Sequence, residues 1–341
     1  MSAAPTTSTP APLPPEHVIA GHLPGAGWLV EGAFRFDRHL IMMMAFLRQF
    51  FPPRHVARVV GAPPCAWTLD LYGRRRPLRP DSCAQIMQVY GESDVGVVLC
   101  FDNPLVTGSD TEDAMGHRLV QLLMQPEQNP TGRNAVCVAN EELAAVLRER
   151  YPSLPLICHQ NRLIMATSKR TPAMYDKLGE SYREIILHPR DAVNPAFFTA
   201  LKQPWKYIAV LNDPAPRNYA ARRELLQLVA EQRRRPWDFD LAESMDRLAT
   251  RTGLFATEAT CNLTCEEESA LYGAGVRSFL LQSFMFRNEL TLFWDMFYHL
   301  FRTRPEYANE AALIASAGMA YIRESVDDLP TGLKLFNFAD N

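Results

Sequence analysis

The fold class follows from a stretch in the first third of the chain, VGVVLCFDN at residues 95–103. Its first seven residues are apolar on both faces and rich in valine, which is typical of a buried strand in a parallel sheet. The strand then runs directly into Asp102 and Asn103, residue types that open loops and turns. The same pattern, an apolar run that ends in polar residues, recurs along the chain.

Eight apolar runs of this kind alternate with amphipathic helical stretches. They lie at residues 55–60, 95–101, 135–139, 154–158, 184–187, 207–211, 254–260 (the weakest) and 276–281. Helix start signals follow several runs: Asn140 precedes one helical stretch, and Thr264 with Glu267 forms a capping box. We therefore expect an α/β protein with a closed (β/α)8 TIM-like barrel. An open doubly wound sheet is the alternative, but no Gly-x-Gly-x-x-Gly turn follows the first run.

One folded domain is expected, preceded by two other segments. Residues 1–16 are rich in Pro, Thr, Ser and Ala and carry too little apolar surface to offset the entropy of ordering, so they predict a disordered tail. Residues 17–54 predict an N-terminal helical extension, with one helix from Asp37 through Phe50. Residues 55–341 are assigned to the barrel.

Composition excludes several classes of protein. The formal net charge of −3 argues against a nucleic-acid-binding protein, and no apolar run is long enough to span a membrane. The N-terminus lacks the basic start and apolar segment of a secretory signal, so we expect a cytoplasmic protein. Its seven cysteines are then expected as free thiols.

Candidate functional residues are the polar side chains that follow the strands, because barrel sites form at the carboxyl ends of strands. The candidate catalytic residues are His159, His188, Asp102 and Asp213. The candidate substrate-binding residues are Asn103, Gln160, Asp191, Asn212, Arg217, Asn262 and Gln282. Loop starts are polar in any barrel, since such residues form turns and caps. The two histidines are explained less well in this way, because histidine is not a favoured cap.

Three chemistries fit these residues. A histidine oriented by Asp102 or Asp213 could act as a general base. His159 and His188, with one of the carboxylates, could hold a divalent metal, although its ligands would have to come from separate strands. The asparagine and glutamine amides could bind a ligand without catalysis. Cys158 lies next to His159, but adjacent strand residues face opposite sides, so we expect Cys158 to pack in the core.

Four stretches in the second half carry a family resemblance: IILHPRD at 185–191, YIAVLNDP at 207–214, NLT at 262–264 with Glu267, and GVRSFLLQ at 275–282. They resemble the collagenase-like peptidase superfamily, which includes the ubiquinone-hydroxylation accessory proteins, and the resemblance implies a (β/α)8 barrel. Its relatives hold an iron–sulfur cluster through cysteines just after the sixth strand. Here Ala215 and Tyr219 stand in those places, so a cluster is not expected, and no nucleophile or metal motif supports peptidase activity.

We therefore expect a barrel enzyme that acts on a small polar, amino-acid-like metabolite in specialised biosynthesis, with a divalent metal as the cofactor to test for. The alternative is a non-catalytic binding or accessory protein that has lost the cluster of its relatives. No nucleic-acid or membrane partner is expected. Formation of a homo-oligomer through the outer helices stays open.

Overall fold

The computed structural model describes residues 23–50, 56–69, 77–130, 132–166, 169–216, 219–234, 241–252, 260–282, 296 and 298–300. The chain divides into two compact units, of which one comprises residues 25–35 and 56–285 and the other comprises the remainder. In that other unit, α1 (Asp37–Phe50) confirms the helix predicted in the N-terminal extension. The predicted disordered tail, residues 1–16, lies outside the described residues.

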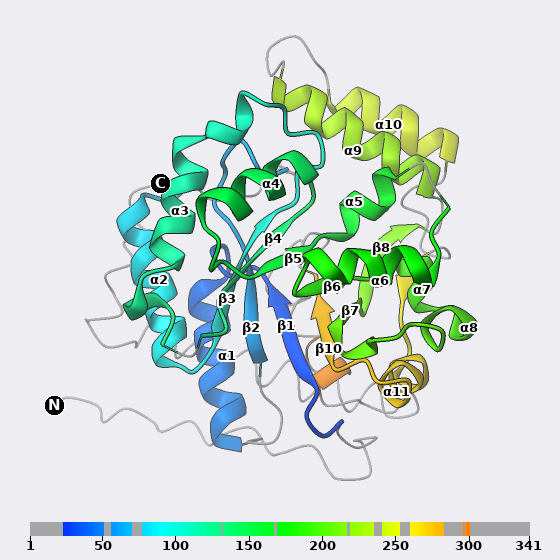
Figure 1. Ribbon diagram of the computed structural model, residues 1–341, viewed down its shortest axis with the longest axis horizontal. Coiled ribbons are helices and arrows are strands. Elements are labelled where there is room, and N and C mark those ends of the chain that lie inside the picture. The colour runs from blue at the N-terminus through cyan, green and yellow to red at the C-terminus, as the bar shows by residue number, and fades with distance from the viewer. Residues whose placement is uncertain are drawn as a thin grey trace, which may run out of the picture. The chain divides into compact units, whose positions relative to one another are not determined.

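The first unit is a closed barrel of eight parallel strands, as predicted (Figure 1). Around the ring the strands are β1 (Gly27–Glu31), β10 (Ser278–Leu281), β7 (Tyr207–Val210), β6 (Glu184–Ile186), β5 (Leu156–Cys158), β4 (Ala135–Val138), β3 (Gly96–Phe101) and β2 (Val56–Gly61). β2 and β10 both pair with β1, which closes the ring. Six of the expected apolar runs therefore form barrel strands between β2 and β7, and the last run forms β10.

Two strand assignments from the sequence were wrong. The first barrel strand is β1, which the sequence analysis placed in the N-terminal extension, so the barrel does not begin at residue 55. Its apolar core is only Trp28-Leu29-Val30, too short to stand out beside the glycines before it. The weak run at 254–260 forms no described barrel strand: its last residue begins β9 (Thr260–Asn262), which pairs antiparallel with β8 (Asn212–Pro216) in a separate sheet.

Helices connect the strands as the sequence predicts. Those of this unit are α2 (Pro80–Glu92), α3 (Ala114–Leu123), α4 (Glu141–Arg150), α5 (Gln160–Met165), α6 (Pro172–Ser181), α7 (Pro189–Ala192), α8 (Pro195–Phe198), α9 (Tyr219–Arg234), α10 (Leu241–Thr252) and α11 (Cys265–Gly273). Single 3₁₀ turns are η2 (Asp110–Glu112), η3 (Pro126–Gln128) and η4 (Pro204–Lys206). The capping box of Thr264 and Glu267 is present, and Asn140 caps α4. No helix among the described residues is both long and apolar enough to cross a bilayer.

The interior of the barrel is built in layers, because alternate residues of a strand face the same side. Apolar and thiol side chains fill its middle and upper layers: Leu29, Val60, Val98, Cys100, Ala135, Cys137, Ile157, Ile186, Ile208, Val210 and Leu280. Arg58 and Glu184 each lie two residues before a member of this set, so they face the interior one layer lower, towards the amino ends of the strands. Arg58 Nη2 donates to Glu184 Oε1 at 2.6 Å, and Nη1 pairs with Oε2.

This ion pair crosses the barrel, because β2 and β6 lie on opposite sides of the ring. Ser278 Oγ on β10 donates a third, longer hydrogen bond to Glu184 Oε1 at 3.4 Å. The side chains of Arg58 and Glu184 are 11% and 13% exposed. The pair is therefore largely withdrawn from water and depends on mutual neutralisation.

We expect Arg58→Met to lower the free energy of unfolding by about 3–5 kcal/mol, because Glu184 would be left as a buried, uncompensated charge. The double variant Arg58→Met/Glu184→Met should recover most of that loss. Urea denaturation of both variants measures the effect. If Arg58→Met is as stable as the parent chain, Glu184 does not depend on Arg58 for neutralisation.

A second constraint lies where α3 packs on Trp67. The indole is fully buried, lies edge-on to Phe101 and His117 with ring centroids 4.9 Å away in each case, and donates from Nε1 to the Asp110 carbonyl at 2.6 Å. A Cβ at Gly116 would lie 2.4 Å from Trp67 Cε3. Only glycine therefore lets the helix approach the ring this closely.

Gly116→Ala should destabilise the protein by about 1–3 kcal/mol, the usual cost of overpacking a core. The matched control is Gly273→Ala at the end of α11, where a Cβ would meet nothing within 4 Å. That change should be neutral or stabilise by up to about 1 kcal/mol, because alanine favours the helix. Thermal unfolding of the two variants tests this. Equal changes in unfolding temperature would show that close packing of Gly116 on Trp67 does not matter for stability.

Candidate functional site

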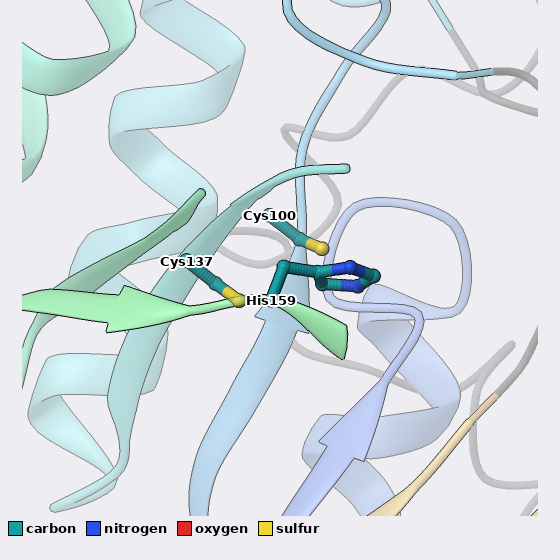
Figure 2. A group of neighbouring side chains, drawn as sticks. All are labelled: Cys100, Cys137 and His159. Atoms are coloured by element: carbon teal, nitrogen blue, oxygen red, sulfur yellow. The ribbon is translucent and has the colours of Figure 1, made fainter. Parts of the chain in front are cut away.

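Three side chains from neighbouring strands meet in the upper part of the barrel (Figure 2). Cys100 lies near the end of β3, Cys137 lies beside it on β4 as its register partner, and His159 directly follows β5. The two Sγ atoms and one imidazole nitrogen lie within 4.8 Å of one another. In the described ranges, this Cys–His cluster is the one group of three or more His, Cys, Asp or Glu residues gathered this tightly.

Strand alternation explains why these residues meet. Val98 and Ala135 face the barrel interior, and Cys100 and Cys137 follow two residues later on the same face. Ile157 also faces the interior, so Cys158 turns away and His159 returns to the inner side. All three members of the cluster are buried, with 2%, 1% and 6% exposure for Cys100, Cys137 and His159.

Within the cluster the two thiols differ strongly in acidity. Hydrogen bonding by Cys137 is the largest influence on Cys100 and, with the charge of His159, lowers the Cys100 pKa to about 6 despite burial. Burial and the neighbouring Cys100 raise the pKa of Cys137 well above its usual range. Of the two thiols, Cys100 is therefore the one that ionises more readily.

His159 lies beside Cys100, and its charge favours the ionised form of that thiol. Burial acts to lower the pKa of His159, but the charge and hydrogen bond of Cys100, together with Asp102, leave that pKa raised. Its Nδ1 accepts a hydrogen bond from the Asn161 backbone N–H at 3.0 Å, which orients the ring. The cluster therefore offers a thiolate, a thiol and an imidazole, a donor set that suits either nucleophilic chemistry or a soft metal.

Both predicted histidines serve as helix caps, contrary to the sequence argument that histidine is a poor cap. His159 caps α5 through Nδ1, and His188 caps α7 by accepting from the Arg190 N–H at 3.2 Å. His188 is fully buried, and burial first, then nearby arginines, lower its pKa to about 2. It therefore stays neutral. His188 is not a member of the Cys–His cluster, so no described metal group contains both histidines.

The predicted carboxylates and amides at the carboxyl ends of the strands mostly form hydrogen bonds with the backbone. Asp102 Oδ1 accepts from Leu69 N at 2.8 Å, and Asn103 donates to the Ala66 carbonyl at 3.1 Å. Both contacts hold the segment after β2 against the end of β3. Asp102 is also near enough to the Cys–His cluster to favour the charged form of His159.

Two further predicted residues are held in structural pairs. Asp191 Oδ2 accepts from Arg170 Nε at 2.8 Å and from the Tyr175 hydroxyl at 2.7 Å. Asn212 clamps the backbone of Gln282, accepting from its N–H at 2.7 Å and donating to its carbonyl at 3.1 Å.

Gln160 and Gln282 behave differently. Gln160 has no exposed surface, and neither atom of its amide has a hydrogen-bond partner among the residues that the structure describes. Gln282 is 5% exposed, and its Oε1 likewise lacks a partner within the described ranges. Because buried amides are costly when unpaired, these two side chains are suited to meet a bound ligand or water.

Three further predicted residues lie partly or wholly outside the described part of the chain. Asp213 and Asn262 lie on β8 and β9, which pair with one another through Asn212, Asp213, Cys261 and Asn262. Their side chains and the whole of Arg217 lie outside the described residues.

Cys100 and Cys137 were missed in the sequence analysis. Each is the penultimate residue of its strand, so strand alternation counted back from the ends of neighbouring strands could have placed both on the inner face. Cys158 was correctly assigned to the core: it is fully buried, and burial raises its pKa to about 12. That thiol is accordingly unreactive.

Comparison with known proteins finds likeness among solved structures. No family model matches the chain, and no curated protein matches it. Among solved structures, the U32 peptidase Mk0906 is similar, with 14% identity and a TM-score of 0.46 over 75% of this chain and 92% of the other. No activity is carried over from it to this chain.

The metal-free protein should show a thiolate signal that is lost as the pH falls through about 6, because the Cys100 pKa is lowered to that value. Ultraviolet thiolate absorbance, measured as the difference between the parent chain and Cys100→Ser, follows the titration. Cys137→Ala should move the midpoint upward by removing the main hydrogen bond to the thiolate. Cys158→Ser is the control and should leave the curve unchanged; an unshifted midpoint in Cys137→Ala would contradict this assignment.

Proposed function

We propose that the chain is a metal-assisted barrel enzyme that acts on a small polar metabolite at the carboxyl ends of the strands. The observation that carries this proposal is the Cys–His cluster, in which three buried ligand atoms lie within 4.8 Å of one another. Barrel enzymes bind substrate at this end of the strands. The cluster therefore has both the donor set and the location of a catalytic centre.

The ligand types favour zinc or a similarly soft divalent ion. Two sulfurs and one imidazole suit Zn²⁺, whereas Mg²⁺ and Ca²⁺ prefer oxygen ligands. Two thiolates would cancel the charge of a divalent ion, so the filled site would place no net charge among the apolar residues of the barrel. Three protein ligands also leave a fourth position for water or substrate, as in catalytic zinc sites.

Metal binding would cost His159 the hydrogen bond that it accepts from the Asn161 N–H, and this cost is small. Nδ1 accepts from the Asn161 N–H, so an imidazole bound to metal would use that nitrogen or require a proton on it. Either change gives up a helix cap, which costs about 1 kcal/mol. Structural zinc sites contribute about 10–16 kcal/mol, so the loss of one cap is easily offset.

The polar side chains that follow the strands suit a substrate with both hydrogen-bond donors and acceptors. A bound metal would polarise a substrate carbonyl or lower the pKa of a water molecule. The amides of Gln160 and Gln282 can each donate and accept, which fits an amino-acid-like molecule. A role in specialised biosynthesis stays a prediction, since no residue identifies a pathway.

A second function is favoured by one specific observation. The lowered pKa of Cys100 and the raised pKa of His159 favour a thiolate beside a histidine, the arrangement used by enzymes with a cysteine nucleophile. In this case Cys100 would attack the substrate and His159 would exchange protons with it, with no metal. The same residues are used in both proposals, so the two are separated by metal content.

Elemental analysis of the full chain purified in the presence of zinc tests the proposal. We expect about one zinc ion per chain, with at least a tenfold loss of affinity in Cys100→Ser, Cys137→Ser and His159→Ala. Cys158→Ser and His188→Ala are the matched controls, a buried cysteine and a buried histidine outside the cluster, and should keep the metal.

A chain that binds no zinc would point to one of the two alternatives. A chain that binds no zinc, but in which Cys100 is the residue alkylated fastest and His159→Ala slows that alkylation, would replace the metal proposal with thiol catalysis. A chain that neither binds zinc nor shows a reactive Cys100 would overturn both and leave the non-catalytic accessory protein.

A further inference from the structure

A pocket of about 360 Å³ lies at the other end of the barrel from the Cys–His cluster. Its lining residues are Arg58, Arg133, Arg183, Glu184, Trp205 and Lys206. All of them belong to the beginnings of strands or to the turns just before them: Arg133 precedes β4, Arg183 precedes β6, and Trp205 and Lys206 lie in η4 before β7. We call this the basal pocket.

The lining of the basal pocket carries an excess of positive charge. Arg58 and Glu184 neutralise each other through their two-point contact. Of the other cations, Arg133 pairs with Asp94, lying 3.4 Å from its carboxylate and donating to its backbone carbonyl at 2.9 Å, whereas Lys206 donates to a neutral acceptor, the Gly179 carbonyl at 2.7 Å. Arg183 is exposed and has no ion pair within the part of the chain that the structure describes. Arg183 and Lys206 are thus the two cations of the lining that form no ion pair among the described residues.

Trp205 adds a flat apolar surface to this charged pocket. It is 57% exposed, and it is the large hydrophobic side chain that stands out as exposed among the described residues. An exposed indole beside cations suits a ring that can stack on it. A simple phosphate or sulfate would leave this surface unused.

We propose that the basal pocket binds a small phosphate ester that carries an aromatic or heterocyclic ring, of which a nucleoside monophosphate is the chemical type. The phosphate lies against Arg183 and Lys206, because guanidinium and ammonium groups bind phosphate oxygens. The ring stacks on Trp205. The volume is that of a small-molecule site, and the net charge of −3 for the whole chain disfavours a nucleic-acid polymer as the occupant.

This site is independent of the Cys–His cluster, because the apolar layers of the barrel separate the two ends. Calorimetric titration of the full chain, after removal of metal, tests it with four probes: AMP, phenyl phosphate, inorganic phosphate and adenosine. We expect saturable binding of AMP and phenyl phosphate, at least about tenfold weaker binding of inorganic phosphate and adenosine, and affinity that falls with added salt.

The variants Arg183→Ala and Trp205→Ala change exposed side chains, so both should fold, and each should weaken AMP binding at least about tenfold. Arg247→Ala, an arginine 73% exposed on α10, is the matched control and should bind AMP as the parent chain does. Cys100→Ser should also bind normally, which separates this site from the proposed metal centre. Absence of saturable AMP binding, or equal affinity in Arg183→Ala and Trp205→Ala, would overturn the proposal.

Discussion

Closure of the strand ring through β1 is the constraint on which the other features of this unit depend. β1 pairs with β2 on one side and β10 on the other, so no barrel strand is left with an unpaired edge. A closed ring of parallel strands gathers all carboxyl ends at one opening and all amino ends at the other. The neighbouring positions of Cys100, Cys137 and His159, and those of the basal cations, are consequences of this one geometry.

The two ends of the barrel differ in chemistry because each strand contributes different residues along its length. Arg58 and Glu184 near the strand starts give a charged base, apolar side chains fill the middle, and the thiols lie near the strand ends. The middle layer has a physical effect on both ends. It keeps water from the thiols, which makes the acidity of Cys100 sensitive to its immediate neighbours. It leaves each end of the barrel open to a ligand from the solvent on that side.

The sequence was sufficient to predict the barrel because strand–helix alternation is a local signal that recurs along the chain. The fold prediction therefore holds although one strand was missed and another was misplaced. β1 was missed since its apolar core spans only Trp28-Leu29-Val30, and β9 was misplaced since pairing with β8 is a tertiary event. His159 was predicted from its position after a strand. Cys100 and Cys137 were not, because the register that sets them side by side is not encoded in either segment alone. The capping role of both histidines was likewise invisible until the backbone N–H groups were placed.

The Arg58–Glu184 pair has a mechanical consequence for the barrel as a whole. A tie between opposite strands resists flattening of the circular cross-section, and this tie acts only at the base. At the opposite opening the ion pair between Arg170 and Asp191 does not join opposite barrel strands. The Arg58–Glu184 pair therefore holds the barrel diameter at the base and leaves the opening with Cys100, Cys137 and His159 without such a tie among the described residues, which is the end that would have to adjust around a bound ion.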